Sequence, residues 1–518
     1  MTIGAAIGNV SWFAASLPEY SRFNRDAANI KAAQQAKLKR YLEINAHTAF
    51  GRQHDFAGIQ NFEDYARRVP IRSYDEFEPW ITKIADGEER VLTADPVRLF
   101  EPTSGSSGPS KLIPFTDSLQ SEIRQAVAAW SSSNFLTYPG LLPGRAYWSI
   151  TPQISDIERE TTAVPIGFDE DSAYLGGLTE KLINKTLATD PRLKQVRDIE
   201  RFWEMTLLML LRCRDLRIIS VWHPSFLSLL IERLRKNWQH LLQELAGEDS
   251  RRAGELGACG AGDLGKIWPE LRVISCWADA HAATSIPGIR RLFPNVVIQP
   301  KGLMATEGVV TVPVGVQHPL AVRSHVYEFL DDNDNALAPW QLQKGEEYSV
   351  VLTTGGGLYR YRIGDKVMVD GFYREVPSLR FLGRENRVSD HFGEKLSEAF
   401  VGDVIVRMSA ENGLSPEFAM LALDDDRPLP AYVLYLQAEG AISDRLEQHL
   451  ERELCANPHY ELCVRLGQLG PARVEAIKGN GFDIYSARLS AMGMKLGDIK
   501  PTPLSLHCGW RRFFSSTG

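Results

Sequence analysis

A run of small and hydroxylated residues that ends in a lysine has the clearest chemical meaning in this sequence. It reads TSGSSGPSK over 103–111 and lies between two strand-like segments, VRLFEP and LIPF. Glycine lets the backbone approach phosphate oxygens closely, and the hydroxyls of Thr103, Ser104 and Ser106 can donate hydrogen bonds to them. Most Ser/Gly runs are flexible linkers, but the terminal Lys111 and the flanking strands favour a phosphate-binding loop. The GxxxxGK[ST] order of a Walker loop is absent.

Two carboxylates follow where a nucleotide site would need them. Glu307 ends the segment GLMATE over 302–307, and Asp365 ends YRYRIGD over 359–365. Mg²⁺ on ATP prefers one or two carboxylates besides the phosphates, which fits Glu307. A carboxylate after a strand can accept hydrogen bonds from both ribose hydroxyls, which fits Asp365. Each motif alone is also typical of a helix cap or a hairpin turn, so the prediction depends on the whole set.

The order of the motifs resembles the adenylate-forming superfamily, which includes firefly luciferase and the acyl-CoA synthetases. TSGSSGPSK, ATEG, YRYRIGD, GREN with GEK, and a lysine near the C-terminus follow one another as they do there. More narrowly, the chain resembles the acyl-acid amido synthetases of the Gretchen Hagen 3, or auxin-responsive, type. NAHTAFGRQHDF, VPIRSYDEF and ITKIADGE resemble that family too, and KGLMATEGVVTVPV resembles its bacterial members.

The resemblance implies a role for each matched residue. The residues expected to bind ATP are Thr103, Ser104, Ser106, Thr306, Glu307, Asp365 and Lys395. Glu307 is expected to ligate Mg²⁺ and to act in catalysis, and Lys395 is expected to approach the nucleotide in one orientation of the small domain. The family's YASSE motif reads LMATE here, so its tyrosine has no counterpart, and the resemblance does not indicate which residue stacks on the adenine.

A lysine near the C-terminus resembles the family's closing catalytic lysine. Lys500 in LGDIKPTP is a better match than Lys495 because it directly precedes the proline. Attack of a carboxylate on the α-phosphorus of ATP builds negative charge, which a positioned cation stabilises in a site that excludes water.

The resemblance implies a reaction in two steps. A small carboxylic acid attacks ATP, which yields an acyl adenylate and pyrophosphate; an amine, such as an amino acid, then displaces AMP and forms an amide. An acyl-CoA ligase would share the first step, and a carboxylate- or nucleotide-binding protein without turnover would keep the fold. The intact lysines and carboxylates disfavour that last alternative. Trp222, His223 and Trp277 are candidates for an acyl pocket, although tryptophan in such strands is more often part of a core.

These side chains need a scaffold, and the chain is long enough for a large and a small domain. Alternating helical and strand patterns predict an α/β fold: a large N-terminal adenylate-forming domain over 1–382, with helices packed on mixed β-sheets. A hinge at GREN then leads to a small, mobile α+β domain over 383–518. LRIISVWHP is expected to be a buried strand between helices, and the segment 249–266, with five glycines, is expected to be a surface loop.

Composition excludes several classes of protein. The net charge of −7 leaves no basic surplus for a nucleic-acid partner, and the six cysteines are scattered without a CxxC pair, which disfavours a disulfide framework or a zinc site. No signal peptide and no apolar run of about 18 residues is visible, so neither a membrane association nor secretion is expected. The prediction is a cytoplasmic protein whose oligomeric state the sequence does not indicate.

Overall fold

The computed structural model describes residues 3–103, 111–149, 162–167, 185–190, 192–193, 196, 198–385, 387–438, 444–492, 494 and 499–514. The α-helices are α1 (Ile3–Asp26), α2 (Ile30–Asn45), α3 (Ala49–Gln53), α4 (Phe62–Arg68), α5 (Tyr74–Ala85), α6 (Asp117–Thr137), α8 (Ile199–Arg212), α9 (Pro224–Lys236), α10 (Trp238–Glu248), α11 (Ser250–Gly257), α12 (Leu264–Ile267), α13 (Ile286–Leu292), α14 (Glu398–Glu411), α15 (Asp444–Leu454), α16 (Pro458–Arg465), α17 (Gly481–Ala491) and α18 (Arg511–Phe514).

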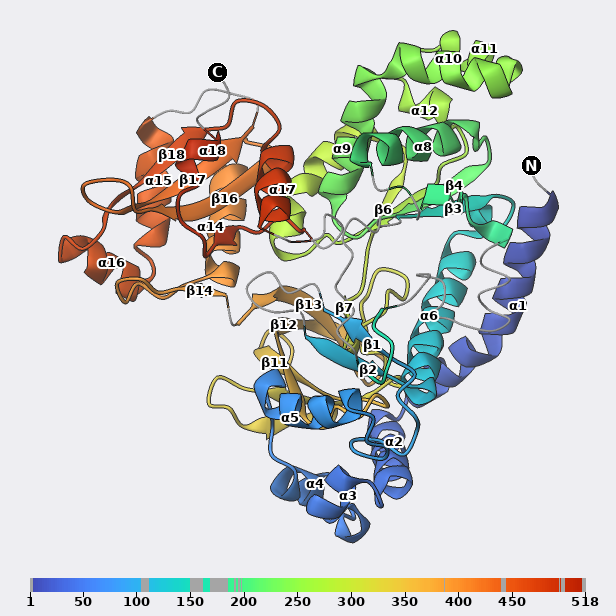
Figure 1. Cartoon of the computed structure of the whole chain (residues 1–518), viewed down its shortest axis with the longest axis vertical. Coiled ribbons are helices and arrows are strands. Elements are labelled where there is room, and N and C mark those ends of the chain that lie inside the picture. Colours follow the sequence, from blue (N-terminus) through green and yellow to red (C-terminus); the bar gives the residue numbers. More distant parts are fainter. Residues whose placement is uncertain are drawn as a thin grey trace.

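The strands form several sheets. They are β1 (Leu99–Pro102), β2 (Leu112–Phe115), β3 (Arg145–Trp148), β4 (Leu216–Ser220), β5 (Val273–Cys276), β6 (Val297–Pro300), β7 (Met304–Ala305), β8 (Gly308–Val309), β9 (Val326–Leu330), β10 (Ala336–Leu337), β11 (Glu347–Thr353), β12 (Tyr361–Tyr373), β13 (Val376–Arg384), β14 (Val388–Ser389), β15 (Leu396–Ser397), β16 (Phe418–Asp424), β17 (Ala431–Gln437), β18 (Gly470–Ala476) and β19 (Leu504–Ser505). Figure 1 shows three lobes: β9–β13 with α2–α5, β3–β6 with α8–α12, and the C-terminal lobe from β14 onward.

A parallel sheet of order β3-β4-β5-β6 divides two hydrophobic cores of the large domain. Successive side chains of a strand point to opposite faces, so Ile218 packs into the core around β9–β13, and Ile219 packs into the core with α8–α13. Both faces are therefore covered, which explains why neighbouring positions such as Ile218 and Ile219 are both apolar. The prediction of a buried strand between helices is confirmed, because β4 lies between α8 and α9.

The prediction of a surface loop over 249–266 is wrong, because α11 and α12 occupy most of this segment. Asp249 and Asp263 cap the two helices by accepting hydrogen bonds from the backbone N–H groups of Arg252 and Lys266. The buried Arg252 side chain donates to the carbonyls of Leu211 and Ile267 at 2.9 and 2.7 Å. Aspartate caps and these tertiary contacts outweigh the low helix propensity of glycine.

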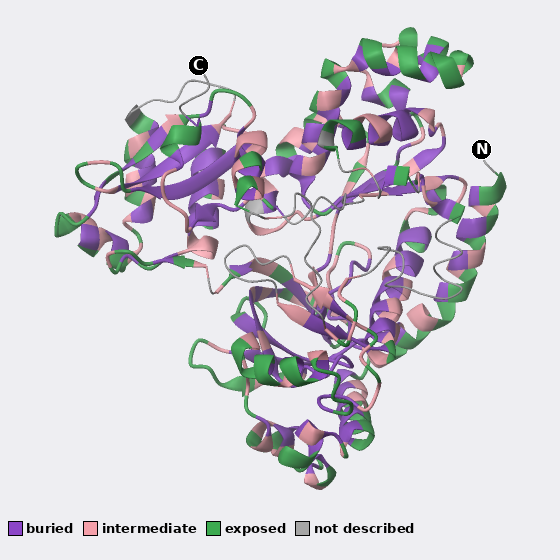
Figure 2. Ribbon diagram, viewed as in Figure 1, coloured by how far each residue is buried: buried purple, intermediate pink, exposed green. Residues whose placement is uncertain are grey.

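An antiparallel sheet of order β10-β9-β11-β12-β13 forms the other part of the large domain. The helices α2 to α5 lie beside it in Figure 1, and its strands are buried along most of their length in Figure 2. Strand β12 runs next to β13, with Asp365 directly opposite Arg384 in the register. The sheet therefore carries one predicted site residue on a strand whose position is determined by neighbours on both sides.

The buried carboxylate of Glu122 joins distant parts of the large domain. It accepts a hydrogen bond from the Tyr41 hydroxyl at 2.6 Å and one from the backbone N–H of Gly355 at 2.9 Å, and it lies 3.0 Å from Nδ1 of His325. The Lys37 ammonium is 3.4 Å away. Burial raises the pKa of Glu122, but Lys37, His325 and Tyr41 outweigh burial and hold that pKa below its ordinary value.

The C-terminal lobe has its own core on both faces of a sheet of order β18-β17-β16-β19. Leu421 and Leu423 of β16 pack with α14 and α15 on one face, whereas Met420 and Ala422 pack with α17 and α18 on the other. This strict alternation explains why β16 and β17 are apolar at nearly every position. This arrangement agrees with the α+β fold that the sequence predicts for the part of the chain after the GREN segment.

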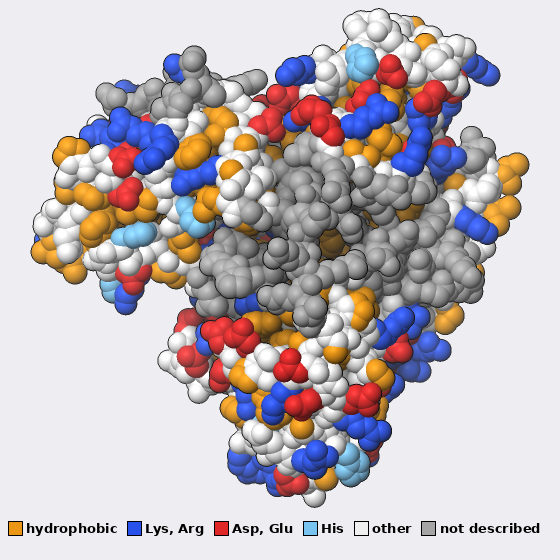
Figure 3. Space-filling model, viewed as in Figure 1, with side chains coloured by type: hydrophobic (Ala, Val, Ile, Leu, Met, Phe, Trp, Pro, Cys, Tyr) orange, Lys and Arg blue, Asp and Glu red, His pale blue; other side chains and the backbone are white. Residues whose placement is uncertain are grey.

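The surface shows no field of a single charge sign on the face seen in Figure 3, where acidic and basic side chains are interspersed. All six cysteines are unpaired thiols. Within the described ranges, no helix is long and apolar enough to cross a membrane.

Replacing Glu122 tests how much the large domain depends on this carboxylate. Glu122→Gln leaves Lys37 buried without its counter-charge and should lower the free energy of unfolding by about 3 kcal/mol at pH 7 in urea titrations. The loss should shrink as the pH falls below about 4.3, where wild-type Glu122 becomes protonated in the unfolded chain and then in the folded protein.

The matched control is Glu43→Gln, because Glu43 is exposed and forms an i,i+4 pair with Lys39 at 3.7 Å. It should cost no more than about 0.5 kcal/mol. Equal effects of the two substitutions would contradict a structural role for the Glu122 cluster.

Candidate active site

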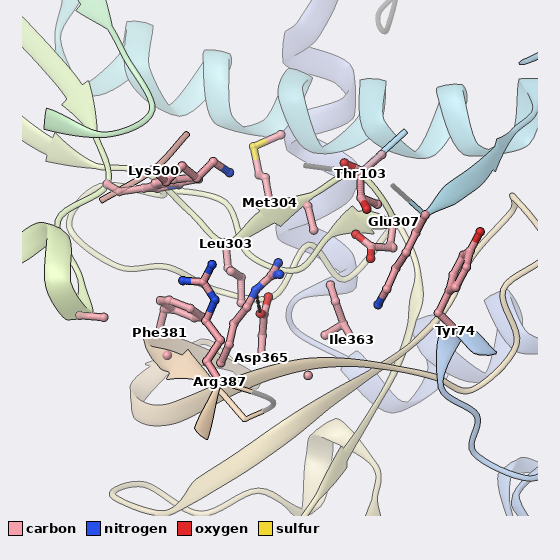
Figure 4. A pocket seen from close by; sticks show the side chains of 18 of the residues that line it. Tyr74, Thr103, Leu303, Met304, Glu307, Ile363, Asp365, Phe381, Arg387 and Lys500 are labelled. Carbon is pink, nitrogen blue, oxygen red and sulfur yellow. Dashed lines mark ion pairs between the residues drawn. The ribbon is translucent and has the colours of Figure 1, made fainter. Parts of the chain in front are cut away.

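A cavity of about 1240 Å³ lies between the large domain and the C-terminal lobe. The sequence-predicted residues that line it are Thr103, His223, Trp277, Thr306, Glu307, Asp365 and Lys500. In Figure 4, Lys500 and Glu307 lie on opposite sides of the view, with Asp365 between them. Residues separated by almost four hundred positions in the chain thus meet in one cavity.

Glu307 stands at the turn between β7 and β8, where little of its carboxylate surface is exposed. Its Oε1 accepts a hydrogen bond from the Tyr361 hydroxyl at 3.2 Å. The neighbouring backbone is held from behind, because the N–H of Val309 donates to Nε2 of His325 at 3.0 Å. A side chain on Gly308 would meet that same Nε2 at 2.7 Å, so only glycine allows the imidazole this close to the turn.

Glu307 has the donor chemistry for Mg²⁺ carried by a nucleotide. Magnesium takes oxygen ligands from one or two carboxylates, and phosphates and water supply the others. The described part of the chain has no group of three or more His, Cys, Asp or Glu residues that could hold a metal by themselves. These residues therefore fit an ion that arrives with ATP rather than one held by a protein cage.

Asp365 is almost completely buried at the cavity wall. Nε of Arg384 on β13 lies 3.2 Å from its Oδ1, but the contact lacks hydrogen-bond geometry, and Oδ1 accepts no hydrogen bond from the described residues. Burial raises the pKa of Asp365 to about 6, with Glu307 adding to the rise and the charges of Arg384 and Lys500 opposing it. A buried acceptor without a hydrogen-bond donor fits a ligand hydroxyl.

Thr103 and Lys111 mark the two ends of the predicted phosphate loop. The backbone N–H of Thr103 donates to the carbonyl of Lys111 at 2.8 Å, at the loop end of the β1–β2 hairpin, and both residues line the cavity. Ser104 and Ser106 lie outside the described residues. The two ends of the predicted loop therefore lie at the cavity.

Lys500 comes from the C-terminal lobe and faces residues of the large domain. Its Nζ lies 4.5 Å from the centroid of the Trp277 ring, in a cation–π arrangement. Its carbonyl accepts a hydrogen bond from the Tyr485 hydroxyl at 3.1 Å. Trp277 follows β5, so the ring at the end of the parallel sheet is a contact surface for the lysine of the other domain.

Arg387 links the hinge to the segment that carries Lys500. Its NH1 group donates to Oε1 of Glu398 at 2.8 Å and to the Thr502 hydroxyl at 3.0 Å, and that hydroxyl donates to the same Glu398 oxygen at 2.7 Å. The three side chains form a closed polar triangle two residues from Lys500.

Lys395 and Trp222 are not brought into the cavity. Lys395 is exposed, and its backbone has a φ of 46°, in the left-handed region. Trp222 is 42% exposed, and its ring lies beside Trp277 with the centroids 5.6 Å apart. His223 lines the cavity, yet its Nδ1 caps α9 by accepting from the backbone N–H of Ser225 at 3.2 Å.

Comparison with known proteins identifies the family of this chain. Three family models match the chain: the GH3 family N-terminal domain over residues 19–298, the central domain over 318–384 and the C-terminal domain over 404–507. The chain belongs to the GH3 family. The putative indole-3-acetic acid-amido synthetase GH3.10 of Oryza sativa subsp. japonica is 25% identical, and the alignment covers 79% of this chain and 91% of the relative.

Solved structures show the same GH3 fold. The acyl acid amido synthetase AtGH3.15 in complex with 2,4-DB matches with a TM-score of 0.83 at 19% identity, over 95% of this chain and 94% of that one. A 2-hydroxyisobutyryl-CoA ligase in complex with 2-HIB-AMP matches with a TM-score of 0.54 at 13% identity, over 87% and 86% of the two chains. The α/β fold with a large and a small domain is therefore that of GH3 proteins and adenylate-forming enzymes.

Sequence reasoning missed two cavity residues of this GH3 protein, Arg384 and Lys301, and the residue that hydrogen-bonds Glu307, Tyr361. Arg384 was part of the predicted hinge, but only the β12–β13 register shows that it faces Asp365. Tyr361 belongs to the YRYRIGD motif, but nothing in that motif indicates that its hydroxyl donates a hydrogen bond to Glu307. Lys301 opens the KGLMATEG segment, and its position one residue after β6 is a signal that could have been used, since ligands of parallel sheets bind at the carboxyl ends of the strands.

The elevated pKa of Asp365 makes a prediction about stability. The folded-state value of about 6 lies above the ordinary one, so the proton is held more tightly in the folded protein. The stabilisation is complete below about pH 4 and is lost as the pH rises through 6. Asp365→Asn cannot ionise, so relative to wild type it should gain about 2 kcal/mol between pH 4.5 and pH 8.

Urea unfolding at both pH values measures this gain. Asp332→Asn, at an exposed carboxylate that lies 3.5 Å from Lys366, is the matched control and should show no gain of this size. If the free energy of unfolding of wild type instead rose relative to that of Asp365→Asn between pH 4.5 and pH 8, burial would not be what raises the pKa of Asp365.

Proposed function

We propose that this GH3 protein is an AMP-forming ligase that adenylates a small carboxylic acid with ATP and transfers the acyl group to an amine, such as an amino acid, to form an amide. The observation that carries the proposal is the meeting of Glu307, Asp365 and Lys500 in one interdomain cavity. A protein that only bound carboxylates would not need a lysine from a second domain at this position.

ATP binding is assigned to the large domain. Thr103 and the loop that follows it, which includes Ser104 and Ser106, bind the phosphates together with Thr306, and Asp365 accepts hydrogen bonds from the ribose hydroxyls. Glu307 ligates Mg²⁺, which, when bound, neutralises charge on the phosphates. The buried Asp365 oxygen without a hydrogen-bond donor supports the ribose assignment.

Lys500 acts in the first half-reaction. The acid's carboxylate oxygen attacks the α-phosphorus, the bond to pyrophosphate breaks, and negative charge grows on the α-phosphate oxygens. A cation held by Trp277 and backed by Tyr485 lies where it stabilises that charge in a partly closed site. The nitrogen of the amine then attacks the acyl carbon, AMP leaves with the bonding electrons, and the amine loses a proton.

The C-terminal domain, predicted to span 383–518, changes orientation between the two half-reactions. The present arrangement suits adenylation, because Lys500 lines the cavity whereas Lys395 is exposed. Arg387, Glu398 and Thr502 connect the hinge to the Lys500 segment, so a rotation at the hinge would carry Lys500 away and allow Lys395 to approach.

Partners and location follow from the same chemistry. The partners are the carboxylic acid, ATP with Mg²⁺ and the amine; no nucleic-acid or membrane partner is proposed. ATP and unpaired cysteines are typical of the cytoplasm, where we place the protein.

Pyrophosphate release tests the proposal directly. Wild type with ATP, Mg²⁺ and a panel of carboxylic acids should release pyrophosphate only when an acid is present, and an amino-acid mixture should then yield AMP and an amide. Lys500→Ala should lower acid-dependent release by about 100-fold, because it removes a charge that acts mainly in the transition state.

Lys344→Ala is the matched control, since Lys344 is exposed and lies outside the cavity lining. It should leave the rate unchanged. Turnover that requires coenzyme A rather than an amine would show that the protein is an acyl-CoA ligase and not an amido synthetase. Binding of ATP without release of pyrophosphate for any acid would favour a protein without turnover.

Magnesium dependence tests the role of Glu307. Glu307→Gln keeps the shape of the side chain and its contact with Tyr361 but loses the charge, so the Mg²⁺ concentration for half-maximal pyrophosphate release should rise by about tenfold. Removing free metal with a chelator should abolish release in both proteins. An unchanged magnesium dependence in Glu307→Gln would remove Glu307 from the metal site.

A further inference from the structure

Lys301 is a cavity residue that the proposed mechanism does not use. It stands one residue after β6, lines the cavity and is only partly accessible. Its Nζ lies 4.2 Å from the centroid of the Trp222 ring. An indole face attracts an ammonium group but accepts none of its three N–H donors as a carboxylate would.

Other poorly exposed cations of this protein have a partner close by. Lys37 lies 3.4 Å from Glu122, and the guanidinium of Arg360 binds both carboxylate oxygens of Glu328 at 2.8 and 2.9 Å. Within the described ranges, no carboxylate forms an ion pair with Lys301. Burial accordingly lowers the pKa of Lys301 to about 7, with a small opposing effect from Cys276. A charge kept in this environment fits a ligand that supplies the missing anion.

The position of Lys301 separates it from the nucleotide residues. Asp365 lies 3.2 Å from Arg384 on the antiparallel sheet, whereas the backbone N–H of Lys301 donates to the carbonyl of Cys276, at the end of β5 in the parallel sheet, at 2.8 Å. Lys301 therefore belongs to the end of the cavity built by the parallel sheet. Here the carboxyl ends of β4, β5 and β6 present His223, Trp277 and Lys301, one after each strand or nearly so.

We propose that Lys301 binds a second anionic group on the carboxylic acid substrate, so that the acid is a dicarboxylate or a comparable diacid. The inference rests on the proposed function, because it assigns this end of the cavity to the acid. One carboxylate faces Lys500 and reacts, while the other group pairs with Lys301. Trp277 and the apolar Leu303 and Met304, which also line the cavity, contact the body of the molecule between them.

Matched acids test the assignment by equilibrium binding, which needs no turnover. Isothermal titrations at pH 6.5, below the pKa of Lys301, compare hexanoate with adipate and phenylacetate with 4-carboxyphenylacetate. Wild type should bind the diacid of a pair more tightly, by roughly 10-fold to 100-fold, as a charge-assisted hydrogen bond contributes. Lys301→Met should remove this preference, and Lys301→Arg should retain most of it.

The controls separate the alternatives. Lys344→Met, at an exposed lysine outside the cavity lining, should keep the wild-type preference. A wild type that prefers the monoacid in both pairs would overturn the inference. So would a Lys301→Met variant that weakens both members of a pair equally, since Lys301 would then bind the reacting carboxylate. If Lys301→Met does not fold, Lys301→Gln and the wild-type preference decide.

Failure of the proposed function would look different. It would appear as the absence of acid-dependent pyrophosphate release in wild type, whatever the binding preference. A preference for diacids without pyrophosphate release would support the Lys301 site and contradict the ligase. Pyrophosphate release with monoacids alone would support the ligase and contradict the Lys301 site.

Discussion

The buried Glu122 carboxylate is the constraint on which the active-site geometry depends. It joins α2 through Tyr41, the turn at Gly355 and the imidazole of His325. The N–H of Val309 donates a hydrogen bond to Nε2 of His325, so the neutral ring carries its proton on Nδ1. That N–H group donates a hydrogen bond to the carboxylate of Glu122. A buried charge, satisfied from several elements at once, thus supports the turn that presents Glu307. This rigidity holds the proposed Mg²⁺ ligand in place before substrates bind.

Two residues that line the cavity are less fully satisfied than Glu122. Asp365 keeps a buried oxygen without a hydrogen-bond donor, and Lys301 keeps an ammonium over an indole ring. Their pKa values move in opposite directions, upward for the acid and downward for the base, because burial disfavours the charged form of each. Glu122 and Arg360 show that the same fold satisfies buried charges more fully elsewhere, so the two less satisfied groups coincide with the cavity.

Much of the architecture followed from local patterns. LRIIS, LRVISC and AYVLYLQ contain strands because short, mostly apolar segments bounded by turns are buried in a sheet that is covered on both faces. The segment 249–266 was mispredicted, since its glycines argue against helices locally, while Asp249, Asp263 and the buried Arg252 favour them through capping and contacts with distant carbonyls. Capping pairs are visible in sequence, but the partners of Arg252 are not.

The sequence by itself determined the kinds of chemistry available: a hydroxyl-rich loop ending in Lys111, two carboxylates and a lysine near the C-terminus, in an order that resembles one enzyme family. Those properties are local, so residue types and spacing carry them. Only the tertiary structure decided that Arg384 faces Asp365, that Trp277 supports Lys500 and that Lys301 is held beside the end of β5. Strand register, domain orientation and burial determine these relations, and each arises from contacts between segments that are distant in the chain.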